Sequence, residues 1–153
     1  MKLKLIIVFG LALVLASCGG DAKKEAAPAE EKAVETKTEN ADPMANKGIG
    51  PISRVTLGEI DQTMVAEGEK VFKAKCTASH KISKKYVGPA LNGVTERRSP
   101  EWIMNMAMNP EEMIQKDPIA KALLIEYNGA PMANQNITED EARAMLEYFR
   151  TKN

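Results

Sequence analysis

The sequence predicts an all-α domain of about four or five helices in roughly its last hundred residues, and it contains no convincing β-strand pattern. Three helix starts support this fold class. Asp61 precedes a run with helical spacing, Ser99 precedes Pro100, and Thr138 opens a Thr-x-x-Glu capping box. Asp, Ser and Thr are preferred at such positions because their side-chain oxygens accept hydrogen bonds from the first unpaired backbone N–H groups of a helix.

The first helix is expected over about residues 62–75, in the stretch QTMVAEGEKVFKAK. Apolar or small residues fall on one face of this helix, including Val65, Gly68, Val71 and Phe72. Glycine is unfavourable in a helix interior. We therefore expect Gly68 to lie where another stretch of backbone packs closely.

The remaining helices are expected to begin at similar signals. A second helix starts after Ser99 and stops before Pro110, and short helices follow from Pro110 (PEEMIQ) and Pro118 (PIAKALLIEY). The last helix is expected over about 139–151, where apolar residues form a single stripe. Residues 86–94, YVGPALNGV, are expected to form a loop because glycine and proline punctuate them.

The N-terminus has the features of an export signal. Lys2 and Lys4 precede the apolar run Leu5–Leu15, which is too short to span a bilayer. The following letters, LASC, resemble the bacterial lipoprotein box. This resemblance implies that residues 1–17 are a lipoprotein signal peptide and that Cys18 becomes the lipidated N-terminus. The alternative is an ordinary secretory signal with an incidental cysteine.

Residues 18–49 are expected to be the lipidated cysteine followed by a disordered linker rich in Ala, Glu and Lys. A flexible chain of this length reaches roughly 30 Å. The folded domain is expected to occupy residues 50–153. We therefore expect a protein on the periplasmic or cell-surface face of a bacterial membrane. Lys plus Arg and Asp plus Glu both number 21, so the charge gives no reason to expect nucleic acid as a partner.

The stretch KAKCTASHKISKK, residues 73–85, contains the only histidine of the chain. If Ser79 were cysteine, Cys76 to His80 would form C-x-x-C-H, the attachment motif of a c-type haem. Taken alone, C-x-x-S-H is a weak signal. On these five residues alone, an exposed cysteine at a helix end beside a surface histidine is the favoured explanation.

Four motifs, in order along residues 64–153, resemble the class I c-type cytochromes. They are GEKVFKAKCTASH (68–80), GPALNG (88–93), a proline-containing loop with a methionine (NGAPMANQN, 128–136) and a C-terminal helix with an acidic start and closing aromatics (TEDEARAMLEYFR). The resemblance implies a small cytochrome c fold around one haem. It also implies an electron carrier rather than an enzyme.

The same resemblance assigns roles to individual residues. His80 and Met132 would be the two axial ligands of the iron, and the Pro89 carbonyl would accept a hydrogen bond from the His80 ring. Leu91 would pack on the macrocycle. Trp102 is either the ring beside a haem propionate or an ordinary core tryptophan.

Ser79 is the one departure from the family pattern. Cys76 can form the first thioether to the porphyrin, whereas a serine hydroxyl is too weak a nucleophile to form the second. Three outcomes remain open: a single thioether at Cys76, haem held only by ligands and packing, or no haem.

Charged residues suggest a partner. Residues 67–98 carry eight basic side chains against three acidic ones, the basic ones being Lys70, Lys73, Lys75, Lys81, Lys84, Lys85, Arg97 and Arg98. A basic rim around a haem edge would steer the protein to acidic redox partners, although a simply solvated surface is the alternative.

The function expected from all these features is that of a membrane-tethered monohaem cytochrome. It would pass single electrons from a respiratory donor to a terminal reductase or oxidase. Two alternatives remain: a haem-free lipoprotein that acts as a binding or assembly module, and a ligand-sensing haem site from which Met132 dissociates.

Overall fold

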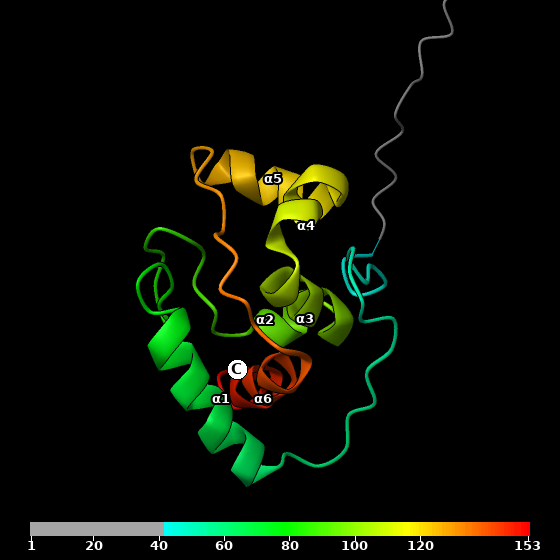
Figure 1. Ribbon diagram of the computed structural model, residues 1–153, viewed down its shortest axis with the longest axis vertical. Helices are drawn as coiled ribbons and strands as arrows, with labels where there is room; N and C mark the ends of the chain where they lie inside the picture. The colour runs from blue at the N-terminus through cyan, green and yellow to red at the C-terminus, as the bar shows by residue number, and fades with distance from the viewer. Residues whose placement is uncertain (1–41) are drawn as a thin grey trace, which may run out of the picture. The chain divides into compact units, whose positions relative to one another are not determined.

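The computed structural model describes residues 42–153, which contain six helices and no strand (Figure 1). The helices are α1 (Gln62–Lys75), α2 (Val94–Arg97), α3 (Pro100–Met108), α4 (Pro110–Lys116), α5 (Pro118–Glu126) and α6 (Glu139–Arg150). The all-α prediction is confirmed. The expected signal peptide 1–17, Cys18 and most of the expected linker lie outside the described residues. No helix within residues 42–153 combines the length and apolar character needed to cross a bilayer.

The three predicted helix starts are present. The Asp61 side chain accepts hydrogen bonds from the backbone N–H groups of Thr63 and Met64, and the Ser99 hydroxyl accepts from Trp102 N–H. Both halves of the capping box at Thr138 are formed. Helix α2 was not predicted, because four residues are too few to show a helical period.

The core is built where α1 packs against α6, two helices from opposite ends of the described chain (Figure 1). A Cβ atom added at Gly68 would lie 2.1 Å from the Ala144 carbonyl oxygen, so only glycine permits this approach. The Phe72 ring centroid lies 5.7 Å from that of Tyr148 and 5.9 Å from that of Phe149. The expectation of close backbone packing at Gly68 is confirmed.

An extended segment precedes α1 and runs along α3 and α4; we call residues 46–58 the N-terminal strap. Buried Asn105 holds it: its Nδ2 donates to the carbonyls of Lys47 and Ile52, both at 2.9 Å, and its Oδ1 accepts from Ile52 N–H at 3.0 Å. Contacts with the helices begin at Asn46, ahead of the expected domain start at residue 50. Asn46, Lys47 and Gly48 are residue types common in linkers, so nothing in the sequence indicated these contacts.

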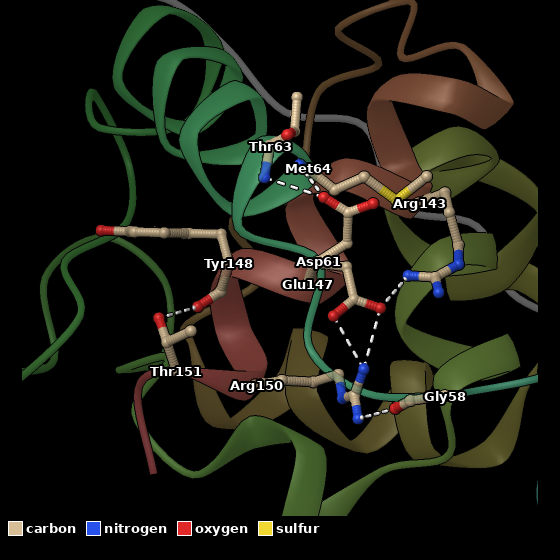
Figure 2. A network of polar contacts seen from close by, with 9 residues as sticks. All are labelled: Gly58, Asp61, Thr63, Met64, Arg143, Glu147, Tyr148, Arg150 and Thr151. Atoms are coloured by element: carbon tan, nitrogen blue, oxygen red, sulfur yellow. Dashed lines mark hydrogen bonds and ion pairs between the residues drawn. The ribbon is translucent and has the colours of Figure 1, made fainter.

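The end of the strap is fixed to α6 by a buried carboxylate (Figure 2). Glu147 is fully buried and lies between the guanidinium groups of Arg143 and Arg150, to which it forms ion pairs. The Arg150 guanidinium also donates to the Gly58 carbonyl at 2.8 Å. Helix α6 therefore holds both α1 and the segment that leads into it.

Candidate functional site

One cavity of about 240 Å³ brings the predicted site residues together. Its walls come from the end of α1, the loop after it, α3, α5, α6 and the loop between α5 and α6. Every predicted cofactor or metal residue of the described chain lines it: Cys76, Ser79, His80, Pro89, Leu91, Trp102 and Met132. Cys18, the predicted lipidation site, lies outside the described residues.

His80 is placed by a turn that follows α1. Its backbone N–H donates to the Cys76 carbonyl at 2.9 Å, and Gly88 N–H donates to the Ser79 carbonyl at 2.9 Å, which brings the loop back across the histidine. His80 Nδ1 lies 3.2 Å from the Pro89 carbonyl oxygen, so the hydrogen bond predicted between these residues is present. When Nδ1–H donates to this carbonyl, the lone pair of Nε2 remains for a metal.

Gly88 is a site residue that the sequence interpretation missed, although the Gly-Pro dipeptide pointed to this loop. A Cβ atom at Gly88 would lie 2.4 Å from Cε1 and 2.8 Å from Nδ1 of the His80 ring. The imidazole therefore rests directly on the Gly88 backbone. Only glycine leaves the ring in the position from which it reaches Pro89.

Burial changes the acid–base properties of the two reactive side chains in opposite ways. It lowers the pKa of His80, with the hydrogen bond to Pro89 opposing the shift, so the imidazole is neutral at neutral pH and able to bind a metal. Burial raises the pKa of the Cys76 thiol; the nearby charge of Lys75 opposes this shift, and that of Glu141 adds to it. The thiol, 3.8 Å from the Met145 sulfur, is therefore mostly protonated in the folded chain.

Met132 lies half-buried in the loop between α5 and α6, where it lines the cavity. Three residues with positive φ shape this loop: Asn128 at 59°, Gly129 at 72° and Asn136 at 51°. Gly129 N–H donates to the Leu124 carbonyl at 2.8 Å at one end, and buried Ile137 and the capping box fix the other. The loop is thus defined at both ends, and it puts a thioether in the same cavity as the imidazole.

Trp102 is 5% exposed and forms part of the cavity wall. Its indole N–H donates to Oδ1 of buried Asp117 at 3.0 Å. The indole N–H therefore already has an acceptor within the protein, and Trp102 also lines the cavity. Asp117 was missed from the sequence, since an Asp-Pro pair indicates only a helix start.

The basic side chains predicted to form a rim differ in their surroundings, and only Lys75, Arg97 and Arg98 line the cavity. On α1, Lys70 and Lys73 pair with Glu67 and Glu69, and Lys75 pairs with Glu141 of α6 at 2.7 Å. Lys84 and Lys85 are exposed on the loop before Gly88. Arg97 and Arg98 line the cavity, and the Arg98 guanidinium carbon lies 5.4 Å from the Trp102 ring centroid.

These residues fit a haem. Within residues 42–153 no three His, Cys, Asp or Glu side chains gather to hold a bare metal ion. The cavity instead offers one imidazole with a fixed ring, one thioether and one thiol among mostly apolar walls. That donor set matches a metal whose other ligands come with its cofactor.

Comparisons with known proteins identify the family of the chain. The family model described as cytochrome c matches residues 65–152. Cytochrome c-551 of Ectopseudomonas mendocina is 30% identical over 87 residues, which are 56% of this chain and 98% of that protein.

Among solved structures, a cytochrome c from Rhodothermus marinus shares 46% identity and a TM-score of 0.68, covering 72% of this chain and 96% of its own. An engineered cytochrome c from Rhodothermus marinus shares 45% identity and a TM-score of 0.64, covering 67% and 89%. The family match covers more than half of the sequence and includes the entire cavity. The chain belongs to the cytochrome c family.

Proposed function

We propose that this protein is a lipid-anchored monohaem cytochrome whose iron is held between His80 and Met132. Membership of the cytochrome c family makes the chain an electron-transfer protein with a haem c cofactor, and not an enzyme. The single observation that carries the site assignment is the cavity itself. It brings together an imidazole oriented by Pro89 and a thioether from a distant loop.

Bound haem supplies one iron that takes up and releases single electrons. Residues of the chain would orient the ligands of this iron and keep water away from it. The Pro89 carbonyl accepts the Nδ1–H of His80, which fixes the tautomer and makes Nε2 a stronger donor. Leu91, Trp102 and Ile103 contribute apolar wall, which excludes water and so limits the rearrangement that accompanies a change of charge.

Covalent attachment is proposed to use Cys76 alone. Cys76 would hold the porphyrin through one thioether, formed by addition of its S–H across a vinyl group, a reaction that needs no oxidant. Ser79 lines the same cavity, but its hydroxyl would leave the second vinyl group unmodified. Haem retained without any thioether is the alternative for this step.

The proposed partners are respiratory redox proteins, a donor and a terminal reductase or oxidase. Exposed Arg97 lines the cavity, and exposed Lys84 and Lys85 lie on the loop that leads to the cavity residue Gly88, so together they support a basic surface beside the cavity. Such a surface speeds encounter with an acidic patch, and screening by salt weakens it. Electron transfer to a partner should therefore slow as ionic strength rises, and Lys84→Glu should slow it further.

The cofactor is tested by producing the full chain in a host that exports proteins and attaches haem. We expect a sharp reduced α band that survives acid–acetone extraction, and an intact mass equal to the mature lipidated polypeptide plus one haem. Ser79→Cys should move the α band to shorter wavelength as the second vinyl group becomes saturated. Cys76→Ser should make the haem extractable.

A colourless wild-type protein with no iron and no porphyrin would refute the proposal. Ser79 favours one other function, a haem-free lipoprotein that acts as a binding or assembly module. It predicts a free Cys76 thiol that reacts with alkylating reagents. Rapid binding of carbon monoxide to the ferrous protein would instead indicate the ligand-sensing alternative, with Met132 dissociated.

The anchor is tested separately. Wild-type protein should remain with the membrane fraction outside the cytoplasm, and Cys18→Ser should release it in soluble form. Release by the variant supports lipid attachment at Cys18, whereas equal behaviour of the two proteins contradicts it.

A further inference from the structure

The N-terminal strap lies ahead of the part of the chain that matches the cytochrome c family, which begins at residue 65. Its position alone suggests a spacer between an anchor and a domain. Its contacts are those of a structural element, because the Ile49 backbone N–H donates to the Met113 sulfur at 2.9 Å and the Asn46 carbonyl accepts from the Ser99 hydroxyl at 2.5 Å. The strap is therefore joined to the start of α3 and to α4.

The most consequential contact is made by the Asn46 side chain. Asn46 Nδ2 donates to Oδ2 of Asp117 at 2.7 Å, and Asn46 Oδ1 accepts from Gly48 N–H at 2.7 Å, which fixes the orientation of the amide. Gly48 has a φ of +73°, and a Cβ there would lie 2.8 Å from the Met113 sulfur. The turn that presents Asn46 is thus tightly constrained.

Asp117 joins three separate segments of the molecule. It is 1% exposed, and its carboxylate accepts from Trp102 Nε1 at 3.0 Å, Ala120 N–H at 2.8 Å and Asn46 Nδ2. The first donor belongs to the cavity wall, the second starts α5, and the third belongs to the strap. Asn46 is the only one of these donors that lies outside the family match.

Helix α5 carries the effect of this carboxylate to the cofactor site. Ala120, Leu123, Leu124 and Tyr127, on or directly after α5, all line the cavity. The loop that contains Met132 begins where α5 ends. The orientation of Asp117 therefore determines how α5 and the indole of Trp102 lie against the cavity.

We propose that Asn46 is a positioning residue for the haem: through Asp117 it holds Trp102 and α5 in place, so the N-terminal strap is part of the cofactor site. This inference rests on the proposed function, since it requires a haem ligated by Met132. Loss of the Asn46 amide leaves Oδ2 of a buried carboxylate without its donor. The wall formed by α5 then loosens, and Met132 leaves the iron more readily.

The test uses full-length holoprotein and added imidazole, which binds ferric haem only when the methionine dissociates. In Asn46→Ala we expect the apparent affinity for imidazole to rise about tenfold, a factor typical of one lost buried hydrogen bond. We also expect a weaker far-red sulfur-to-iron band and a lower midpoint potential, because water reaches the cavity. Lys47→Ala is the matched control: the neighbouring side chain of the same strap donates to the Ser53 carbonyl and does not touch Asp117.

A reciprocal exchange tests the contact itself and guards against simple misfolding. Asp117→Asn alone sets an amide donor against the Asn46 donor. The double variant N46D/D117N restores the hydrogen bond with the donor and acceptor exchanged, and an asparagine oxygen at 117 still accepts from Trp102 and Ala120. We expect the double variant to recover the far-red band and the imidazole affinity relative to Asp117→Asn. Trp102 is the only tryptophan of the chain, so hydrogen exchange of its indole N–H can be followed as a single signal. Slow exchange shows independently that the hydrogen bond from Trp102 to residue 117 is intact.

The outcomes separate the two proposals. A wild-type protein without haem overturns the proposed function and this inference with it. A wild-type protein with Met-ligated haem, combined with an Asn46→Ala variant whose imidazole affinity and potential are unchanged, overturns this inference alone. The same holds if the double variant is no better than Asp117→Asn, or if Lys47→Ala has the full effect of Asn46→Ala.

Discussion

Gly88→Ala is the substitution that most directly tests how the chain holds its histidine. The added Cβ would lie 2.4 Å from His80 Cε1, whereas carbon atoms in contact normally stay about 3.5 Å or more apart. The imidazole must therefore move by about 1 Å, and the 3.2 Å contact between Nδ1 and the Pro89 carbonyl cannot survive such a shift. The φ of Gly88 does not lie in the left-handed region, so alanine is compatible with the backbone and the effect is purely steric.

The size of the effect follows from two losses. Overpacking of this kind typically costs about 1–3 kcal/mol. Loss of the hydrogen bond to Pro89 adds about 0.5–1.5 kcal/mol. We therefore expect the holoprotein to lose about 2–4 kcal/mol in free energy of unfolding. In the apoprotein the loss should be smaller, because an imidazole that is free of iron can turn away from the new methyl group.

The assay compares wild type, Gly88→Ala and Gly58→Ala, the last as control because a Cβ at Gly58 meets no atom within 4 Å. Haem content, midpoint potential and denaturant unfolding are measured on holoprotein. Unfolding is also measured on apoprotein, prepared by extracting haem from the same variants combined with Cys76→Ser. Gly88→Ala should reduce haem content and shift the potential, while Gly58→Ala should remain within about 0.5 kcal/mol of wild type. If Gly88→Ala retains wild-type haem content, potential and stability, then the Gly88 backbone does not hold the His80 ring in place.

Three further substitutions test the surrounding fold. Glu147→Ala leaves Arg143 and Arg150 without their buried partner and should lower the free energy of unfolding by about 3 kcal/mol. The loss stays at the low end for a broken buried ion pair because both arginines keep some contact with water. A loss below about 1 kcal/mol in urea unfolding would contradict this. Hydrogen bonds from Lys75 and from the Thr138 backbone lower the pKa of Glu141, so its stabilising contribution is complete at neutral pH and is lost as the pH falls through its lowered folded pKa. Glu141→Gln should flatten the pH dependence of the unfolding midpoint in that acidic window. Gly68→Ala should cost about 2–3 kcal/mol despite its better helix propensity, since the methyl group meets backbone at Ala144, and a stabilised variant would show that α1 and α6 can move apart freely.

The parts of the fold that were predictable are those encoded by local chemistry. Asp61, Ser99 and Thr138 each satisfy the first N–H groups of the helix that follows them, so a few adjacent letters were enough to place three helix starts. The pair His80 and Pro89 was predictable for a different reason: its spacing matches a family pattern, and the structure contains the hydrogen bond.

The parts that were missed depend on contacts between residues far apart in the chain. Asn46, Asn105 and Glu147 look like ordinary surface residues in the sequence, yet Asn105 and Glu147 are buried and each holds the strap directly or through a neighbouring arginine. Asp117 looks like a helix cap, which it is, but its second oxygen receives a donor 71 residues away. Local pattern contains no information about such partners, so the sequence placed Asn46 in a linker and gave Asn105, Asp117 and Glu147 no role in the tertiary structure.

Ser79 can be understood in the light of these distant contacts. A second thioether mainly prevents haem from leaving, and retention also depends on how tightly the cavity walls are held. Here those walls have an additional support, because the strap ties α3, α4 and the start of α5 together before the family module begins. In a cavity supported in this way, we expect haem retention to depend less on a second thioether than in a cavity formed by the family-matched residues 65–152 alone. It follows that removing the strap contacts should make haem retention depend more strongly on the residue at position 79, so Asn46→Ala should cost more haem in the natural chain than in Ser79→Cys.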